Sequence, residues 1–275
     1  MSLVSLNLNY NLIQNIRIAH AFCEQGCELV VDDCDLIKFQ NLHSFFQIKI
    51  HGKSTIKPCV AQSVNSVSID HSKPSVTTFG DTRPLVYPRE FISFLKARWP
   101  QERPVKFSFT GLMTQQRRTT IYKWAKRNGI FFGLLDKIKV TALGKLSYQK
   151  RVKYLKRYRM TKGGLTVVDS ILGREFPFKS LDLDYYETLS RSQFVLCPNG
   201  DFIWTYRFFE AIMCGAIPLI EEKCDSYDGF RYSLMTEDAN SLVWSEEDAQ
   251  FNYDKCMELL TYPAGFVQSQ LSNCN

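Results

Sequence analysis

The stretch Gln193–Glu222 constrains the fold more than any other part of this chain. It reads QFVLCPNGDFIWTYRFFEAIMCGAIPLIEE, in which two short apolar runs flank a Pro-Asn-Gly turn and an amphipathic segment. Apolar runs bounded by turn residues are typical of buried strands. Thr205 suits the N-cap of a helix, and Gly215 suits the C′ position that ends one. The stretch therefore predicts a strand at Gln193–Cys197, a helix up to Cys214 and a strand at Ala216–Ile220.

Two charged residues stand on that predicted helix. Arg207 and Glu210 are three residues apart, so they share one face within the first two turns. A helix that starts after a strand presents free N–H groups and a positive dipole to an anion, and an arginine adds a bidentate donor for phosphate. Glu210, one turn further along, can accept hydrogen bonds from ribose hydroxyls. The pattern indicates a nucleotide site, and the alternative is an amphipathic helix with a solvated ion pair.

The pattern CPNG-x5-YRFFEAI-x2-GAIPLI, at Cys197–Ile220, resembles the C-terminal signature of the exostosin-like GT-B glycosyltransferases, of the soluble bacterial or large-DNA-virus type. The resemblance is close over this stretch and weak elsewhere. It implies a nucleotide-sugar donor whose base is uracil, that is, a UDP-sugar. It also implies that the donor diphosphate is bound by Arg207, Thr205 and Tyr206, the ribose by Glu210, and that Asn199 and Gly200 belong to the donor loop.

The GT-B fold consists of two Rossmann-like domains that face a central cleft, and a chain of 275 residues is long enough for two compact halves. The composition, 45% hydrophobic and 23% charged, is ordinary for a globular protein. We expect residues 1–130 to form the acceptor-side domain and residues 131–275 the donor-binding domain. The last helix, predicted at Ser245–Thr261, would pack back on the first domain.

The N-terminal half alternates apolar runs with helical periodicity, which favours an α/β fold with a parallel sheet. A long polar loop is expected at Asn65–Arg83. The predicted strands and helix are Ser2–Leu8, Asn11–Gln25 (the helix), Glu28–Val31, Phe45–Ile50 and Ile56–Ser63.

A second arginine is expected at the donor site. Lys106–Thr110 predicts a strand that belongs to a Phe-x-Phe-x-Gly pattern, and Thr119–Arg127 predicts the helix that follows. The same family resemblance implies that an arginine of this region meets the diphosphate. We choose Arg118 over Arg117, and the alternative is that both arginines are merely solvated at a helix start.

The resemblance also implies an inverting reaction, which needs a general base from the N-terminal domain. The first candidate is Asp70, followed by Asp81 and His71, with Asp32 or Asp33 behind them. Most GT-B enzymes need no metal ion, because positive side chains and a helix start stabilise the diphosphate. The Asp182-x-Asp184 pair is expected to cap a helix at Asp184–Ser192 rather than to bind manganese. The acceptor is expected to be an oligosaccharide or another glycan.

The stretch Lys137–Lys162 contains ten lysines and arginines, no acidic residue and three tyrosines. Such a stretch can bind nucleic acid, because basic residues attract phosphates and aromatic rings stack on bases. The net charge of only +6 favours the other interpretation, a charged helix face, over a nucleic-acid partner. A transferase relative that binds a nucleotide sugar without turnover is a further alternative.

The nine cysteines are scattered, odd in number and form no CxxC pair. Cys23-x3-Cys27 with His20 lacks a second ligand pair at zinc-finger spacing, so no metal site is expected. The sequence contains neither a signal peptide nor an apolar run long enough to span a bilayer. We therefore expect a cytoplasmic protein without a membrane span.

Overall fold

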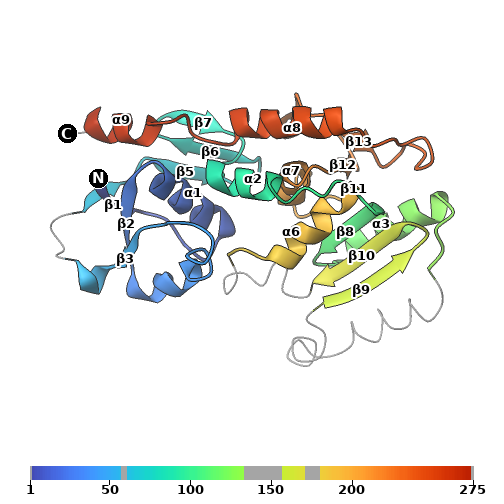
Figure 1. Cartoon of the computed structure of the whole chain (residues 1–275), viewed down its shortest axis with the longest axis horizontal. Coiled ribbons are helices and arrows are strands. Elements are labelled where there is room, and N and C mark those ends of the chain that lie inside the picture. Colours follow the sequence, from blue (N-terminus) through green and yellow to red (C-terminus); the bar gives the residue numbers. More distant parts are fainter. Residues whose placement is uncertain (1, 57–60, 133–156, 171–179, 274–275) are drawn as a thin grey trace. The chain divides into compact units, whose positions relative to one another are not determined.

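The computed structural model describes residues 2–56, 61–132, 157–170 and 180–273 (Figure 1). The chain divides into two compact units. Unit 1 comprises Met1–Ala97, Glu175–Asp182 and Lys255–Asn275, and unit 2 comprises Arg98–Arg174 and Leu183–Asp254. The division near Ala97 differs from the boundary at residue 130 expected from sequence. The strand β8 (Val105–Gly111) explains the difference, because it pairs with two strands of the unit 2 sheet.

Unit 1 contains a parallel sheet whose strands lie in the order β3-β2-β1-β4. The predicted strand at Phe45–Ile50 is wrong for most of its length, because β3 begins only at Ile50. Apolar side chains of α1, among them Ile16 and Phe22, are fully buried. The elements of this part are β1 (Ser2–Leu6), α1 (Ile13–Glu24), β2 (Cys27–Val31), η1 (Asp33–Phe39), β3 (Ile50–Gly52), η2 (Lys53–Thr55), β4 (Gln62–Val64) and α2 (Arg89–Lys96).

The segment predicted as a polar loop, Asn65–Arg83, is instead a three-stranded antiparallel sheet. Its strands are β5 (Val67–Asp70), β6 (Ser75–Thr78) and β7 (Asp81–Arg83). The C-terminal segment of the chain packs on this sheet. The hydroxyls of Thr78 and Tyr262 are 2.7 Å apart. The following helix α9 (Phe266–Asn273), which was not predicted, ties back to β1 through a 3.0 Å hydrogen bond from Ser2 to Gln268.

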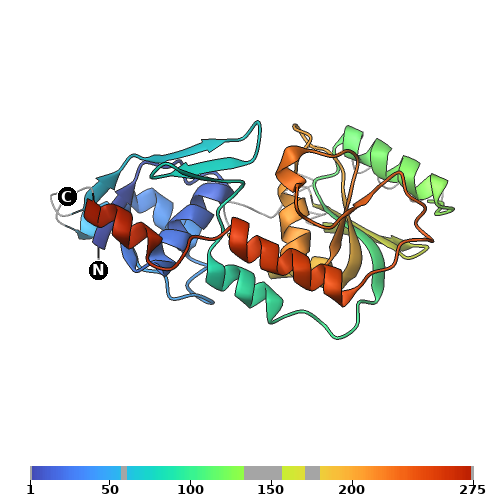
Figure 2. The same cartoon turned by 90° about the horizontal axis from the view of Figure 1, so that it is seen from above.

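Unit 2 is built on a six-stranded sheet with the order β13-β12-β11-β8-β10-β9. All neighbours are parallel except β9 and β10. Helices α6 and α7 contact one face of the sheet and α3 covers the other (Figure 2). The remaining elements are α3 (Gln115–Arg127), β9 (Arg157–Lys162), β10 (Leu165–Ser170), α6 (Leu183–Ser190), β11 (Ser192–Cys197), α7 (Tyr206–Met213), β12 (Ile217–Ile220), η3 (Asp225–Tyr227) and β13 (Ser233–Leu234). Helix α8 (Glu246–Leu259) belongs to unit 2 up to Asp254 and to unit 1 from Lys255 on.

The expected α/β class with parallel sheets is confirmed, and so is the strand, helix and strand order of the Gln193–Glu222 stretch. The basic stretch was expected to form a helix face, but its last residues, 157–162, form the edge strand β9. Residues 137–156 of that stretch lie outside the described residues. Within the described ranges, no helix has both the length and the hydropathy that crossing a bilayer requires.

Candidate functional site at the carboxyl edge of the unit 2 sheet

The start of α7 is fixed by its cap and by aromatic packing. Thr205 is the N-cap, and its hydroxyl accepts a hydrogen bond from the backbone N–H of Arg207 at 3.4 Å, as the sequence predicted. The Thr205 backbone N–H donates to the hydroxyl of Tyr227 at 2.8 Å. The Phe208 ring stacks on Tyr227 with 3.7 Å between centroids. These contacts hold the first turn of α7 against η3.

Arg207 reaches from this turn to the end of β8. Its Nε donates to the carbonyl of Thr110 at 2.8 Å, and the guanidinium lies over the Phe109 ring, 4.3 Å from the centroid. The residue is only 6% exposed, and its buried Nη1 has no hydrogen-bond partner among the described residues. Gly111 leaves the space that the guanidinium occupies, since a Cβ there would overlap with Nη2. The result is a buried cation with an unused donor.

A second arginine, Arg117, approaches from the first turn of α3. Its Nε lies 3.4 Å from the carbonyl oxygen of Asn199, and its Nη1 donates to the carbonyl of Leu112 at 3.2 Å. A Cβ at Gly200 would lie 2.5 Å from Nη2 of Arg117. Burial, and then the positive charge of Arg207, lower the pKa of Arg117. Two guanidinium groups thus lie close enough to repel each other, and an anion would relieve this repulsion.

The sequence placed Arg118 ahead of Arg117 at this site. The contacts with the loop at Asn199 and Gly200, which was expected to bind the donor, come from Arg117. Arg118 is half-buried, and its Nε has no hydrogen-bond partner among the described residues. Tyr206 is also half-buried, with its ring edge-on to Trp204 at 4.8 Å.

The loop after β11 is held by two acidic residues that were not among the predicted site residues. The backbone N–H of Asn199 donates to Oε2 of Glu221 at 2.5 Å, and its side-chain amide donates to Glu222 at 2.7 Å. The other oxygen of Glu221 accepts from the hydroxyl of Thr120, on α3, at 2.8 Å. Glu221 therefore links the loop to α3. The available signal was a pair of acids directly after a buried parallel strand.

Glu210 lies one turn into α7 and is fully buried. Its Oε2 accepts a hydrogen bond from the hydroxyl of Tyr185, on α6, at 2.6 Å. The thiol of Cys197 is close to both charges of α7, and burial raises its pKa to about 12. The thiol is therefore protonated at neutral pH and a poor nucleophile.

The candidate bases from the sequence lie in unit 1, at the two turns of the antiparallel sheet. The carboxylate of Asp70 accepts hydrogen bonds from the hydroxyl and the backbone N–H of Ser72, at 2.6 and 2.9 Å, and these bonds lower its pKa. Asp81 is paired with Arg83 at 2.7 Å. His71 lies between Asp70 and Ser72 in the first turn.

The residues considered for a metal have other partners. Nε2 of His20 lies 2.5 Å from the Glu90 carboxylate. The thiol of Cys23 lies 3.6 Å from the carbonyl of Lys49. Across the described ranges, no group of three or more His, Cys, Asp or Glu residues could hold a metal ion.

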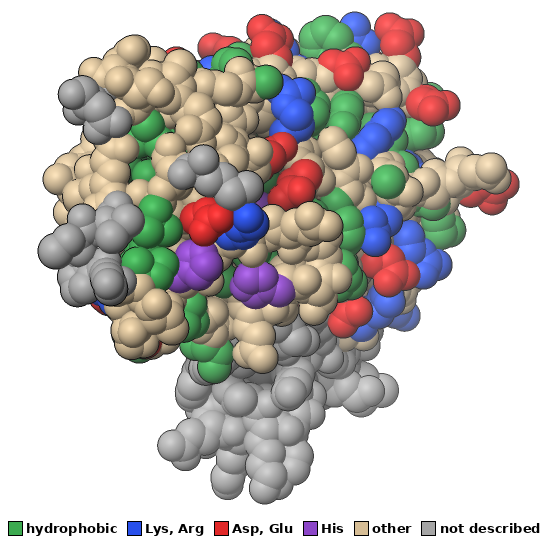
Figure 3. Space-filling view, turned by 60° about the vertical axis from the view of Figure 1, so that its left-hand side comes forward, with side chains coloured by type: hydrophobic (Ala, Val, Ile, Leu, Met, Phe, Trp, Pro, Cys, Tyr) green, Lys and Arg blue, Asp and Glu red, His purple; other side chains and the backbone are tan. Residues whose placement is uncertain are grey.

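The charge distribution bears on the nucleic-acid alternative. On the face drawn in Figure 3, acidic and basic side chains are interspersed among the described residues and form no continuous basic patch. Most of the basic stretch, residues 137–156, lies outside the described ranges, so that alternative stays a hypothesis.

Fold and site together define an α/β protein with two neighbouring arginines at the carboxyl ends of parallel strands. The family model described as the exostosin GT47 domain matches residues 61–246, and the chain therefore belongs to this family of glycosyltransferases. The match confirms the family that the Cys197–Ile220 pattern resembles. No curated protein matches the sequence.

Proposed function

We propose that this protein is an inverting, metal-independent glycosyltransferase that moves a sugar from a UDP-sugar to a hydroxyl of a glycan acceptor. The proposal includes the GT-B arrangement, with two Rossmann-like domains on either side of a cleft. Its main support is the buried Arg207, whose Nη1 has no partner among the described residues, next to Arg117. A diphosphate would supply acceptors for both guanidinium groups.

In the proposed reaction the hydroxyl oxygen of the acceptor attacks the anomeric carbon, the bond from that carbon to the diphosphate oxygen breaks, and a base takes the hydroxyl proton. Negative charge grows on the departing diphosphate. Arg207, Arg117 and the positive end of the α7 helix dipole would stabilise this charge. Arg118 and Tyr206 are further candidates for the same role, next to the loop at Asn199–Gly200.

The base is proposed among Asp70, Asp81 and His71. The hydrogen bonds from Ser72 that lower the pKa of Asp70 also make it a weaker base. Substitution of the true base should lower the rate of sugar transfer and leave UDP affinity unchanged, because the base contacts the acceptor and not the nucleotide.

Glu210 is proposed to bind the ribose. Its carboxylate is fully buried against Tyr185, so a ribose would reach it only after a rearrangement of neighbouring side chains. If Glu210 binds the ribose, its substitution should weaken only ligands that contain ribose. If Glu210 has a purely structural role, its substitution should affect all ligands alike.

The test is calorimetric titration of UDP, UMP, uridine and pyrophosphate into the wild type and into R207A, R207K and E210Q. Wild type should bind UDP equally with and without EDTA. R207A should lose affinity for UDP and pyrophosphate by roughly ten- to hundredfold, because a charge-assisted pair is removed. R207K should recover only part of it, because lysine lacks the planar fork. E210Q should weaken UDP and uridine but not pyrophosphate.

Failure of the wild type to bind UDP, GDP or CMP at millimolar concentration would remove the main support for a transferase. Unchanged UDP affinity in R207A would refute the site. UDP binding without sugar transfer or UDP-sugar hydrolysis would favour the inactive relative. Charge reversal at Lys153, Lys156 and Arg157 should leave UDP binding intact, whereas it would abolish a salt-sensitive nucleic-acid affinity if that alternative held.

A further inference from the structure

The parallel sheet of unit 1 has a feature that the proposed donor site does not use. Along the chain, β2 and β3 are added on one side of β1, and β4 is then added on the other side. The order of the strands therefore reverses at β1. In open α/β sheets, ligands bind outside the carboxyl ends of the strands at such a reversal point.

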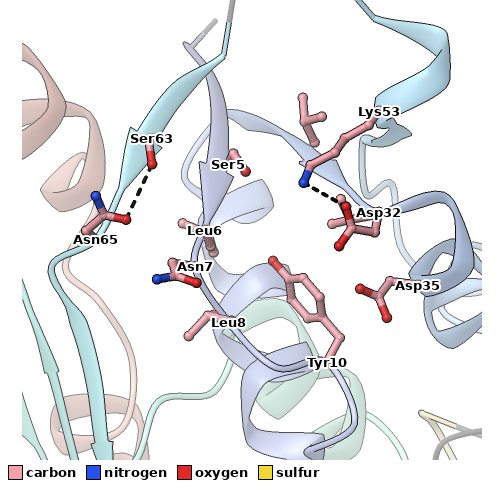
Figure 4. A pocket seen from close by; sticks show the side chains of 12 residues that line it. Ser5, Leu6, Asn7, Leu8, Tyr10, Asp32, Asp35, Lys53, Ser63 and Asn65 are labelled. Carbon is pink, nitrogen blue, oxygen red and sulfur yellow. Dashed lines mark hydrogen bonds and ion pairs between the residues drawn. The ribbon is translucent and has the colours of Figure 1, made fainter. Parts of the chain in front are cut away.

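A cavity of about 240 Å³ lies at this point, between the ends of β1, β2 and β4 (Figure 4). Drug-sized ligands occupy pockets of about 300–1,000 Å³, so this cavity suits a single small ring. Its polar lining includes Asn7, Tyr10, Asp32, Asp35, Lys53 and Asn65.

Tyr10 supplies an unused hydrogen-bond donor to the cavity. The residue is 4% exposed, and its buried hydroxyl has no hydrogen-bond partner among the described residues. The ring packs edge-on against Phe39, with 5.3 Å between centroids, so its position is fixed. Figure 4 shows the hydroxyl directed toward the middle of the labelled side chains. Burial, together with the charges of Asp35 and Asp32, raises the pKa of Tyr10, so the hydroxyl keeps its proton.

The charges at the cavity are balanced. Asp32 is paired with Lys53 at 2.7 Å, and Asp35 accepts a hydrogen bond from Lys38. A phosphate would therefore meet two carboxylates without a surplus of positive charge. A neutral ligand fits better, provided that its groups both donate to carboxylate oxygens and accept from a tyrosine hydroxyl and amide N–H groups. Hydroxyl groups have both properties.

We propose that this cavity binds a neutral, hydroxyl-rich ring, that is, one sugar residue. Hydroxyls of the sugar would donate to Asp32 and Asp35 and accept from Tyr10 and Asn65. That this residue belongs to the acceptor glycan rests on the proposed glycosyltransferase function, whereas the binding itself does not.

The test is saturation-transfer NMR on the full chain with glucose, galactose, mannose, xylose and N-acetylglucosamine as probes, followed by titration of the sugars that give a signal. At least one sugar should bind the wild type. D35N should weaken it roughly ten- to hundredfold, because a hydrogen bond to a charged group is lost. Y10F and N65A should each weaken it about three- to tenfold, as expected for neutral hydrogen bonds. Y232F, a tyrosine change in unit 2, is the matched control and should change nothing.

Circular dichroism and melting curves identify any variant that fails to fold. If Y10F fails to fold, the inference is tested by N65A, because Asn65 is exposed at the rim of the cavity. Several results would overturn the inference: no sugar bound by the wild type at 50 mM (roughly the weakest affinity of interest), equal affinity in all three cavity variants, or saturable binding of Ca²⁺ or inorganic phosphate that excludes the sugars. UDP is titrated into the same samples. UDP binding without sugar binding refutes this inference alone, and sugar binding without UDP binding refutes the proposed function alone.

Discussion

The parallel sheets of the two units share one topological feature, a reversal of the strand order, but the charged side chains at the two reversal points differ. In unit 1 the strand order reverses at β1, and in unit 2 it reverses at β8, which has β10 on one side and β11 on the other. Both candidate sites lie at the carboxyl ends of these strands. At β8 the site holds two neighbouring guanidinium groups, whereas at β1 each carboxylate has a lysine.

We infer from this difference that the strand order determines where a ligand can bind, whereas the side chains of a few neighbouring residues determine which charge the ligand can have. The unit 2 edge suits an anion and the unit 1 edge suits a neutral ligand. Each edge also contains a buried polar group that its own fold leaves without a partner among the described residues, Nη1 of Arg207 and the hydroxyl of Tyr10.

The largest effect should follow from G111A. A Cβ at Gly111 would overlap with the Arg207 guanidinium, and the backbone φ of +150° disfavours a side chain. We expect a loss of UDP affinity of at least about tenfold and a loss of about 1–3 kcal/mol in unfolding free energy. Calorimetry and urea unfolding measure the two. G80A is the control, because its φ is +84° and nothing lies within 4 Å of the added Cβ; it should reproduce the strain and leave UDP affinity unchanged. If G111A bound UDP as tightly as the wild type, the Arg207 guanidinium would not be the anion site of unit 2, and the contrast between the two units would be refuted.

A smaller difference in unfolding free energy is expected between variants of the two buried tyrosines, Tyr185 and Tyr10. Y185F removes the hydrogen bond to the buried carboxylate of Glu210 and should lower the unfolding free energy by about 1–3 kcal/mol. Y10F removes a hydroxyl without a partner and should leave the unfolding free energy within about 0.5 kcal/mol of the wild type, or raise it. Urea titrations of both variants measure the difference. If Y10F proved as destabilising as Y185F, the unused donor in the cavity would be refuted.

The helix starts sharpen the contrast further. T205A should lower the unfolding free energy by about 1 kcal/mol, because the side-chain cap of α7 is lost. T205S keeps a hydroxyl at this position and should stay close to the stability of the wild type. The first helix of unit 1, α1, has Leu12 at its N-cap position and no side-chain cap, and Leu12 is 41% exposed. L12S should therefore stabilise unit 1 by up to about 1 kcal/mol. Melting temperatures of the three variants test both signs, and a loss in L12S would contradict the second.

The smallest effect concerns the pH dependence of unit 1. Hydrogen bonds from Lys49 and then His51 lower the pKa of the half-buried Glu28 carboxylate. A carboxylate whose pKa is lowered in the folded state stabilises the protein at pH values above its ordinary pKa of about 4.3. This stabilisation is lost as the pH falls through the folded-state pKa. E28Q should thus melt slightly below the wild type at pH 7, and the difference should shrink as the pH is lowered and the Glu28 carboxylate becomes protonated. A difference that does not change with pH would mean that packing, not charge, causes it.

The sequence predicted most reliably what local signals determine. The β11, α7 and β12 elements follow from a turn, an N-cap and a C′ glycine that lie within one stretch. The antiparallel sheet at β5–β7 was missed, because strands of three or four residues give only a short periodic signal. One of the contacts of this sheet, from Thr78 to Tyr262, also comes from a residue far away in the sequence.

The arginine of α3 shows how a boundary error alters a site. The helix was expected to begin at Thr119, but Thr114 caps it, so it begins at Gln115. Arg117 then lies in the first turn, and one residue corresponds to about 100° around a helix, so Arg117 and Arg118 point in different directions. The sequence could not reveal the cavity at β1 either, because its lining comes from segments that only the sheet topology brings together.

The three-segment composition of unit 1 has a consequence for biosynthesis. Its first 97 residues leave the ribosome before any of unit 2, yet the unit includes Lys255–Asn275. Arg83 donates to the carbonyl of Thr261, and the amide of Gln268 donates to the carbonyl of Gln25. During translation, the first segment of unit 1 must therefore wait for its last segment, while unit 2 can fold first. A nascent chain that has emerged from the ribosome only as far as Asp254 would therefore hold a complete second unit and an incomplete first one.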